Sequence, residues 1–145
     1  MGQAAIVVID DTDNVREIIG LMLDHKGYSV YSFADPDDAV AVVENVRIDL
    51  FIVDMMMPKI SGIEVLKRLN VREKALEVIM ITGKNDPEDT AEALRHGAYG
   101  ILQKPFSYDE LIASVEQALA SAAAKKQQIN DFLEQQGIDN VGVGK

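Results

Sequence analysis

The sequence predicts an α/β protein built on a doubly wound, five-stranded parallel sheet with the strand order 2-1-3-4-5 and an extended C-terminal helix. Short apolar runs alternate with amphipathic stretches of about a dozen residues, which is the pattern of repeated strand–helix units. The runs at 5–9 and 50–53 are almost wholly apolar, which suits central strands covered by helices on both faces. The run at 28–33 carries more polar residues and suits an edge strand.

Each unit of this pattern assigns one strand and one helix. The strands are expected at 5–9, 28–33, 50–53, 78–82 and 99–103. The helices are expected at 14–26, 36–46, 61–72, 87–96 and 107–135. In the first unit, Asp13 is a candidate N-cap and Gly27 is a candidate left-handed residue at the helix end.

The later helices carry stronger start signals. Asp35-Pro36 and Asp86-Pro87 each place a capping carboxylate before a proline at the first helical position. Ser107 and Glu110 have the spacing of a capping box at the start of the last helix. The local signals therefore agree with the hydrophobic pattern.

Length and composition exclude several classes of protein. With 145 residues the chain has room for one core, and with no cysteine it has neither disulfides nor thiolate metal ligands. The net charge of −10 argues against direct binding of nucleic acid, which requires a basic face. No apolar run approaches the length of a membrane-spanning helix, and no leader is visible, so we expect a cytoplasmic protein without membrane association.

The last predicted helix is longer than a domain of this size needs. We expect a compact domain over 1–122, followed by a helix extension and a flexible tail or linker over 123–145. The extension has two interpretations. It overhangs the domain and frays, or it is a signalling helix that pairs with a partner or leads to an output domain.

Polar side chains follow four of the predicted strands, at the point where each strand ends. Asp10 and Asp11 follow the first strand, Asp54 the third, Thr82 the fourth and Lys104 the fifth. Because the carboxyl ends of parallel strands share one rim, these groups are expected to converge. Three carboxylates repel one another unless a cation lies among them, and hard oxygen ligands suit Mg²⁺. A carboxylate beside a cation can attack phosphorus and form an acyl phosphate.

At these positions the chain resembles the receiver domain of bacterial response regulators, the CheY-like domain of two-component signalling. The resemblance covers residues 4 to about 120, and its most specific part is the D-x-x-M-P-x-x-x-G pattern over 54–62. It implies a flavodoxin-like fold. The matching stretches are Asp10-Asp11, 54–62, Thr82-Gly83 and Lys104-Pro105-Phe106.

The resemblance implies a role for each site residue. Asp54 would be the phosphoacceptor, and Asp10 and Asp11 would hold Mg²⁺ together with Asp54 and the main-chain carbonyl of Met56. Lys104 would bind the phosphoryl group.

The resemblance also implies a conformational switch and a set of partners. Thr82 and Tyr99 would form the switch pair that remodels the face around the fourth helix and fifth strand, and Pro105 would follow a cis peptide bond. The phosphoryl donor would be a histidine kinase or phosphotransfer protein. A homodimer or output domain would use the fourth helix–fifth strand face or the C-terminal helix. Slow loss of its own phosphate would not make the chain a turnover enzyme.

Two other functions remain open from the residues alone. The stretch Asp11-Thr12-Asp13-Asn14-Val15 fits the D-x-D-x-[TV] motif of haloacid-dehalogenase-like phosphohydrolases, with Asp11 as nucleophile. No acidic pair follows a strand after Lys104, however, and that interpretation leaves the 54–62 stretch without a purpose. The second alternative is a receiver-shaped interaction module that works without phosphorylation.

Overall fold

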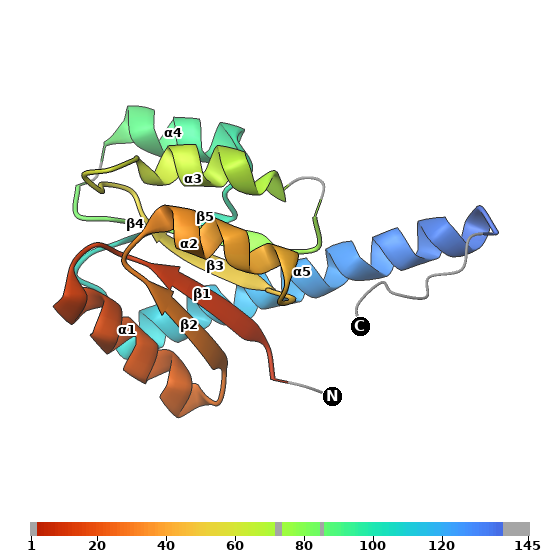
Figure 1. The fold of residues 1–145 in the computed structure, drawn as a ribbon, viewed down its shortest axis with the longest axis horizontal. Helices are drawn as coiled ribbons and strands as arrows, with labels where there is room; N and C mark the ends of the chain where they lie inside the picture. Colours follow the sequence, from red (N-terminus) through yellow and green to blue (C-terminus); the bar gives the residue numbers. More distant parts are fainter. Residues whose placement is uncertain (1–2, 72–73, 85, 138–145) are drawn as a thin grey trace.

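The computed structural model describes residues 3–71, 74–84 and 86–137, and it contains a five-stranded parallel sheet in the order β2-β1-β3-β4-β5 (Figure 1). The predicted fold class and strand order are confirmed. The strands are β1 (Ala5–Ile9), β2 (Ser29–Phe33), β3 (Leu50–Asp54), β4 (Glu77–Thr82) and β5 (Gly100–Gln103). The helices are α1 (Asp13–Lys26), α2 (Pro36–Ala41), the 3₁₀ helix η1 (Val42–Glu44), α3 (Gly62–Leu69), α4 (Pro87–Arg95) and α5 (Tyr108–Gln135).

Alternate residues of the central strands form two separate cores, one on each face of the sheet. Val7, Phe51 and Met80 pack in the core that also contains buried residues of α2, α3 and α4. Ile6 and Ile52 pack in the core that contains buried residues of α1 and α5. Burying one Val, Leu or Ile side chain stabilises a fold by about 1.5–3 kcal/mol. Because β1, β3 and β4 are buried along their whole length, the sheet holds its strand ends in fixed positions.

Most of the predicted helix signals are present in the structure. The Asp35 carboxylate accepts a hydrogen bond from the Asp37 amide, and Ser107 and Glu110 form a reciprocal capping box. Gly27 adopts a φ of 100° after α1, a left-handed conformation that glycine adopts without strain. α3 stops earlier than expected because Asn70 takes the left-handed conformation, with φ 53°. The expected end of that helix at residue 72 lies outside the described residues.

The prediction that Asp13 caps the first helix is wrong. The N-cap is Thr12, and Asp13 is already helical. The cause lies two residues upstream, where the Asp10 carboxylate accepts a hydrogen bond of 2.8 Å from the Thr12 amide and turns the chain early. The Asp13 carboxylate instead pairs with the Arg16 guanidinium at 2.6 Å and is largely exposed.

α5 crosses the sheet and continues well past its amino edge (Figure 1). Its last buried residue is Ala122, and Phe132 on the projecting part is 58% exposed. Where the helix leaves the sheet, the Lys125 ammonium pairs with the buried Glu77 carboxylate at 3.2 Å. No helix in the described ranges is both long and apolar enough to cross a membrane. The domain boundary after residue 122 stays a prediction.

Candidate functional site

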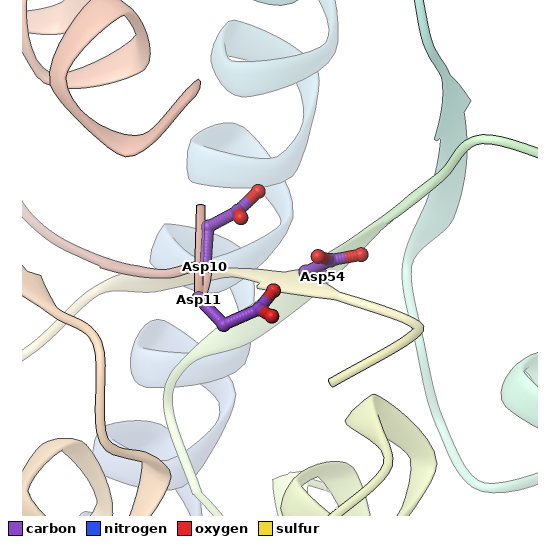
Figure 2. Close-up of side chains that lie close together, drawn as sticks. All are labelled: Asp10, Asp11 and Asp54. Atoms are coloured by element: carbon purple, nitrogen blue, oxygen red, sulfur yellow. The ribbon is translucent and has the colours of Figure 1, made fainter. Parts of the chain in front are cut away.

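Three carboxylates gather at the carboxyl edge of the sheet. Carboxylate oxygens of Asp10, Asp11 and Asp54 all lie within 4.8 Å of one another. Figure 2 shows these side chains leaving two neighbouring strand ends and lying close together. Asp10 is fully buried and Asp54 is 5% exposed, whereas Asp11 faces solvent. The cluster therefore has a buried inner part and a solvent-accessible outer part.

The register of the sheet explains why Asp10 and Asp54 meet. β1 and β3 are hydrogen-bonded neighbours, and Ile9 lies opposite Val53 in the parallel ladder. The next residue on each strand is an aspartate, so the two side chains leave the sheet beside each other. Because parallel strands end on the same rim, the fold brings Asp10 and Asp54 together although more than forty residues separate them along the chain.

Lys104 brings the ammonium group that the sequence predicted for this site. Its Nζ lies 3.3 Å from Asp10 Oδ2 and 3.8 Å from Asp54 Oδ2. Its main-chain amide donates to the Thr82 carbonyl at 2.8 Å, which fixes the end of β5 against the end of β4. The Lys104–Pro105 peptide bond is cis, as the family resemblance implied.

One ammonium group cannot balance three carboxylates. Burial is the main cause that raises the pKa of Asp54, and the negative charges of Asp10 and Asp11 raise it further. The Met56 amide, which donates to Asp54 Oδ1 at 3.2 Å, and the Lys104 ammonium both lower it. The resulting pKa is about 6. Two like charges 4 Å apart repel by about 4 kcal/mol at an effective dielectric of 20. The site therefore favours binding of an additional cation.

The donor set fits a magnesium ion. All three side-chain ligands are carboxylates, which are hard oxygen donors, and Asp11 leaves one side of the cluster open to solvent. Three protein ligands do not fill an octahedral shell, so positions remain for water and phosphate oxygens. Asp10, Asp11 and Asp54 are the residues that would hold the ion. Met56, the proposed main-chain ligand, follows in the loop after β3, and its side chain is 62% exposed.

Thr82 and Tyr99 lie at the end of β4 and just before β5, and in the described residues no hydrogen bond joins either side chain to the acidic cluster. Thr82 is the last residue of β4, and its hydroxyl donates to the Lys84 carbonyl at 2.7 Å and accepts from the Lys84 amide at 3.1 Å. Tyr99 immediately precedes β5 and its side chain is 40% exposed. The threonine hydroxyl is thus engaged within its own turn. The switch role of this pair stays a prediction.

Gly62 has a structural role that the sequence analysis did not explain. A Cβ at this position would lie 2.4 Å from the Asp54 carbonyl oxygen and 2.9 Å from the Met55 Cα, both backbone atoms. The Gly62 amide also donates to the Met55 carbonyl at 3.0 Å. The start of α3 is therefore packed directly against the residue that carries the central carboxylate. The fixed spacing from Asp54 to Gly62 was the signal of this contact.

Arg16 is a second residue that the sequence analysis missed. Its guanidinium donates to the Asp10 carbonyl at 2.6 Å and pairs with Asp13. Asp13 is exposed and is not a member of the carboxylate cluster, which counts against the phosphohydrolase interpretation of the D-x-D motif. The only sequence signal was the i,i+3 spacing of Asp13 and Arg16 on one helix.

Comparisons with known proteins agree with this geometry. The family model described as response regulator receiver domain matches residues 6–116. The alkaline phosphatase synthesis transcriptional regulatory protein PhoP of Bacillus subtilis is 33% identical over 134 residues, covering 90% of this chain and 56% of that protein. The transcriptional regulatory protein FixJ of Bradyrhizobium diazoefficiens is 32% identical over 126 residues, covering 86% of this chain and 62% of that protein.

A solved structure gives the same result. The chemotaxis protein CheY4 of Vibrio cholerae superimposes with a TM-score of 0.76 at 29% identity, covering 81% of this chain and 99% of that chain. The chain thus spans somewhat more than half the length of the two transcriptional regulators, and nearly the whole of the chemotaxis protein.

Proposed function

The chain belongs to the response regulator receiver domain family of two-component systems, and from this premise we propose that it accepts a phosphoryl group on Asp54 in a Mg²⁺-dependent reaction. The donor is a phosphohistidine on a histidine kinase or phosphotransfer protein. One observation carries the proposal. The buried Asp54 carboxylate lies within reach of two further carboxylates and of the Lys104 ammonium.

In the proposed reaction, an Asp54 carboxylate oxygen attacks the phosphorus of the phosphohistidine. The new O–P bond forms as the N–P bond breaks, and the imidazole nitrogen keeps the electron pair and takes up a proton from water. Bound Mg²⁺ would supply positive charge that keeps Asp54 ionised and stabilises the phosphoryl oxygens. The Lys104 ammonium, already between Asp10 and Asp54, is placed to neutralise one phosphoryl oxygen.

We assign the switch to Thr82 and Tyr99. The acyl phosphate adds strong acceptor oxygens beside the end of β4, and they compete with the Lys84 carbonyl for the Thr82 hydroxyl. When the hydroxyl moves to the phosphate, its turn opens and the exposed Tyr99 ring can pack inward. The face around α4 and β5 then differs between the two states, which gives a partner or a second copy a surface to recognise.

The product stays attached to the protein, so the chain acts as a phosphoacceptor in the cytoplasm and not as a turnover enzyme. Slow hydrolysis of the acyl phosphate would reset it.

The test is phosphorylation by acetyl phosphate with Mg²⁺, followed by mass spectrometry of the intact chain and mapping of the modified residue. We expect one acid-labile phosphoryl group on Asp54, and none in Asp54→Asn or without Mg²⁺. Asp86→Asn is the matched control, because it also removes one carboxylate and asparagine is an equally good N-cap. Label on Asp11 would support the phosphohydrolase instead. Complete absence of label would support an interaction module that works without phosphorylation.

A further inference from the structure

A groove runs along the amino edge of the sheet, opposite the acidic cluster. It consists of two cavities of about 710 and 220 Å³ that share Arg47, Ala75 and Lys126 in their linings. The projecting half of α5 forms one wall of the larger cavity through residues such as Ala123 and Gln127. This is the end of the sheet beyond which α5 projects (Figure 1).

We propose that this groove, hereafter the amino-edge groove, binds an acidic segment of a partner protein that also carries apolar side chains. Acidic side chains pair with the lysines at the groove, and an apolar side chain enters the smaller cavity. The site is separate from the phosphoacceptor, and the proposal does not depend on phosphorylation of Asp54.

Charge is the first argument. Arg47, Lys74 and Lys126 line the groove in a chain whose net charge is −10. Within the described ranges Lys74 and Lys126 form no ion pair. The one acid among the described lining residues, Asp49, is already engaged, because it accepts a hydrogen bond from the Ala5 amide at 2.9 Å and pairs with Arg47 at 3.6 Å. A positive surface on an acidic protein attracts a negatively charged partner.

The shape and lining of the smaller cavity are the second argument. Val43, Val46, Ile48 and Leu76 form its apolar walls, next to the two lysines. Ile48 and Leu76 are almost fully buried, so the floor of the cavity is part of the folded core. A cavity of this size accepts one leucine- or isoleucine-sized side chain, the usual anchor of a peptide in a groove.

An unsatisfied acceptor is the third argument. Asn130 lines the larger cavity, and its Oδ1 is buried with no hydrogen-bond partner in the described structure. A buried amide oxygen left without a donor destabilises the folded state. If the Asn130 side chain turns toward the cavity as the peptide enters, a main-chain N–H of the peptide supplies that donor. Carboxylates, an apolar side chain and an N–H donor occur together in a peptide.

Two other possible occupants, a second copy of the chain and the chain's own segment 138–145, fit the amino-edge groove less well. A second copy related by a twofold axis would bring the same lysines face to face, because such an interface uses the same patch on both chains. The chain's own segment 138–145 carries one acid, Asp139, and one base, Lys145, so it has no net side-chain charge to match the groove. An acidic partner segment is the occupant that charge favours.

The experiment measures binding of a fluorescein-labelled ten-residue peptide of Asp, Glu and Leu to the full chain by anisotropy. The control peptide replaces each Asp by Asn and each Glu by Gln. We expect saturable binding of the acidic peptide only, weakened about tenfold or more by Lys126→Glu or Lys74→Glu. Lys126→Arg should retain binding. Lys67→Glu on α3, which makes the same charge change away from the groove, should alter the Kd by less than about twofold.

Backbone amide shifts in NMR spectra locate the peptide. We expect the peptide to perturb the signals of Ala75, Leu76 and Asn130. The same perturbations should occur in the Asp54→Asn variant. Equal weakening by Lys67→Glu, or shifts confined to the α4–β5 face, would overturn the proposal, and so would absence of binding. Peptide binding that tightens more than threefold on deletion of 138–145 would identify the tail as the occupant. A dimer that Lys126→Glu dissociates would identify a second copy.

Discussion

The two edges of the sheet solve the same electrostatic problem in opposite ways. At the amino edge, the buried Glu77 carboxylate is matched by the Lys125 ammonium and the Ser121 hydroxyl. At the carboxyl edge, the equally buried Asp54 shares a single lysine with Asp10 and stands beside Asp11. The buried acid of the amino edge is fully paired, whereas the buried acids of the carboxyl edge are left with excess negative charge.

The difference separates stability from function. Leaving a buried charge unpaired destabilises a fold, so a chain selected for stability alone would pair all its buried acids as it pairs Glu77. The excess charge at the carboxyl edge lowers stability and makes binding of a cation and a phosphoryl group favourable there. Four substitutions and one truncation test this contrast, ordered from the largest expected effect to the smallest.

Gly62→Ala should break the carboxyl edge through packing. The new Cβ would meet two backbone atoms at under 3 Å, so we expect a loss of about 3 kcal/mol in the free energy of unfolding, measured by urea denaturation. Gly20→Ala is the control, because its Cβ would meet only Ser32 Oγ at 3.6 Å and Val30 at 4.0 Å. The control should be neutral or stabilising by up to about 1 kcal/mol. Equal effects of both would contradict the contact with Asp54.

Lys125→Met should give the amino edge an unpaired acid like those at the other edge. Lys125 also donates to the main-chain carbonyls of Val71 and Leu76, at 3.2 and 2.9 Å. We expect a loss of about 2–3 kcal/mol in the free energy of unfolding, largely recovered in the double variant with Glu77→Leu. Lys126→Met is the matched control and should change stability by less than about 0.5 kcal/mol.

The contacts of Lys125 also provide a test of the predicted domain boundary after residue 122. A chain ending at 122 should still fold and bind Mg²⁺, but it should be less stable than a chain ending at 126 by about 2 kcal/mol, since it lacks Lys125. Equal stability of the two would show that Lys125 contributes nothing to the domain.

Asp54→Asn should stabilise the chain in EDTA at low ionic strength. The folded-state pKa of Asp54 is raised from 3.8 to about 6, so the folded chain favours the protonated carboxyl. The Asp54 carboxyl makes its full contribution to the free energy of unfolding below pH 4, and this contribution is lost as the pH rises through 6. The asparagine variant lacks that loss and should gain about 1–2 kcal/mol at pH 7.5, with little gain at pH 4. Denaturation at both pH values measures this, and a strongly destabilised variant at pH 7.5 would contradict the account.

Ser121→Ala should have the smallest effect. It removes the hydroxyl donor to the Glu77 carboxylate but leaves Lys125 in place. We expect a loss of about 1 kcal/mol in the free energy of unfolding. Ser121→Thr should retain the bond, and a loss as large as that of Lys125→Met would mean that the hydroxyl, and not the ammonium, satisfies Glu77.

The strand order and the converging strand-end residues could be predicted from the sequence, because parallel strands bring their carboxyl ends to one rim whatever the loops between them do. That rule was sufficient to predict that Asp10, Asp54 and Lys104 lie close together. Gly62 could not be explained in advance, since its constraint is the approach of the Asp54 carbonyl across a loop. The role of Lys125 could not be predicted either, because its partner Glu77 lies on a strand 48 residues away along the chain.

Local signals failed where a long-range group intervened. Asp13 had the sequence position of a cap, but the Asp10 side chain, held in the acidic cluster, captures the Thr12 amide and starts the helix one residue sooner than predicted. The site thus altered the helix next to it, and propensity alone does not contain that information.

α5 starts just after Lys104-Pro105 and passes Glu77 on its way out of the domain, so a single rod joins both edges. Its 28 residues span about 42 Å at 1.5 Å each, so a tilt of about 5° at its first turn would sweep its far end through about 4 Å. A displacement too small to see beside the phosphoacceptor becomes, at the exposed Phe132, a shift of about 3 Å. The length of α5 therefore converts a small tilt at its first turn into a larger displacement of its far end.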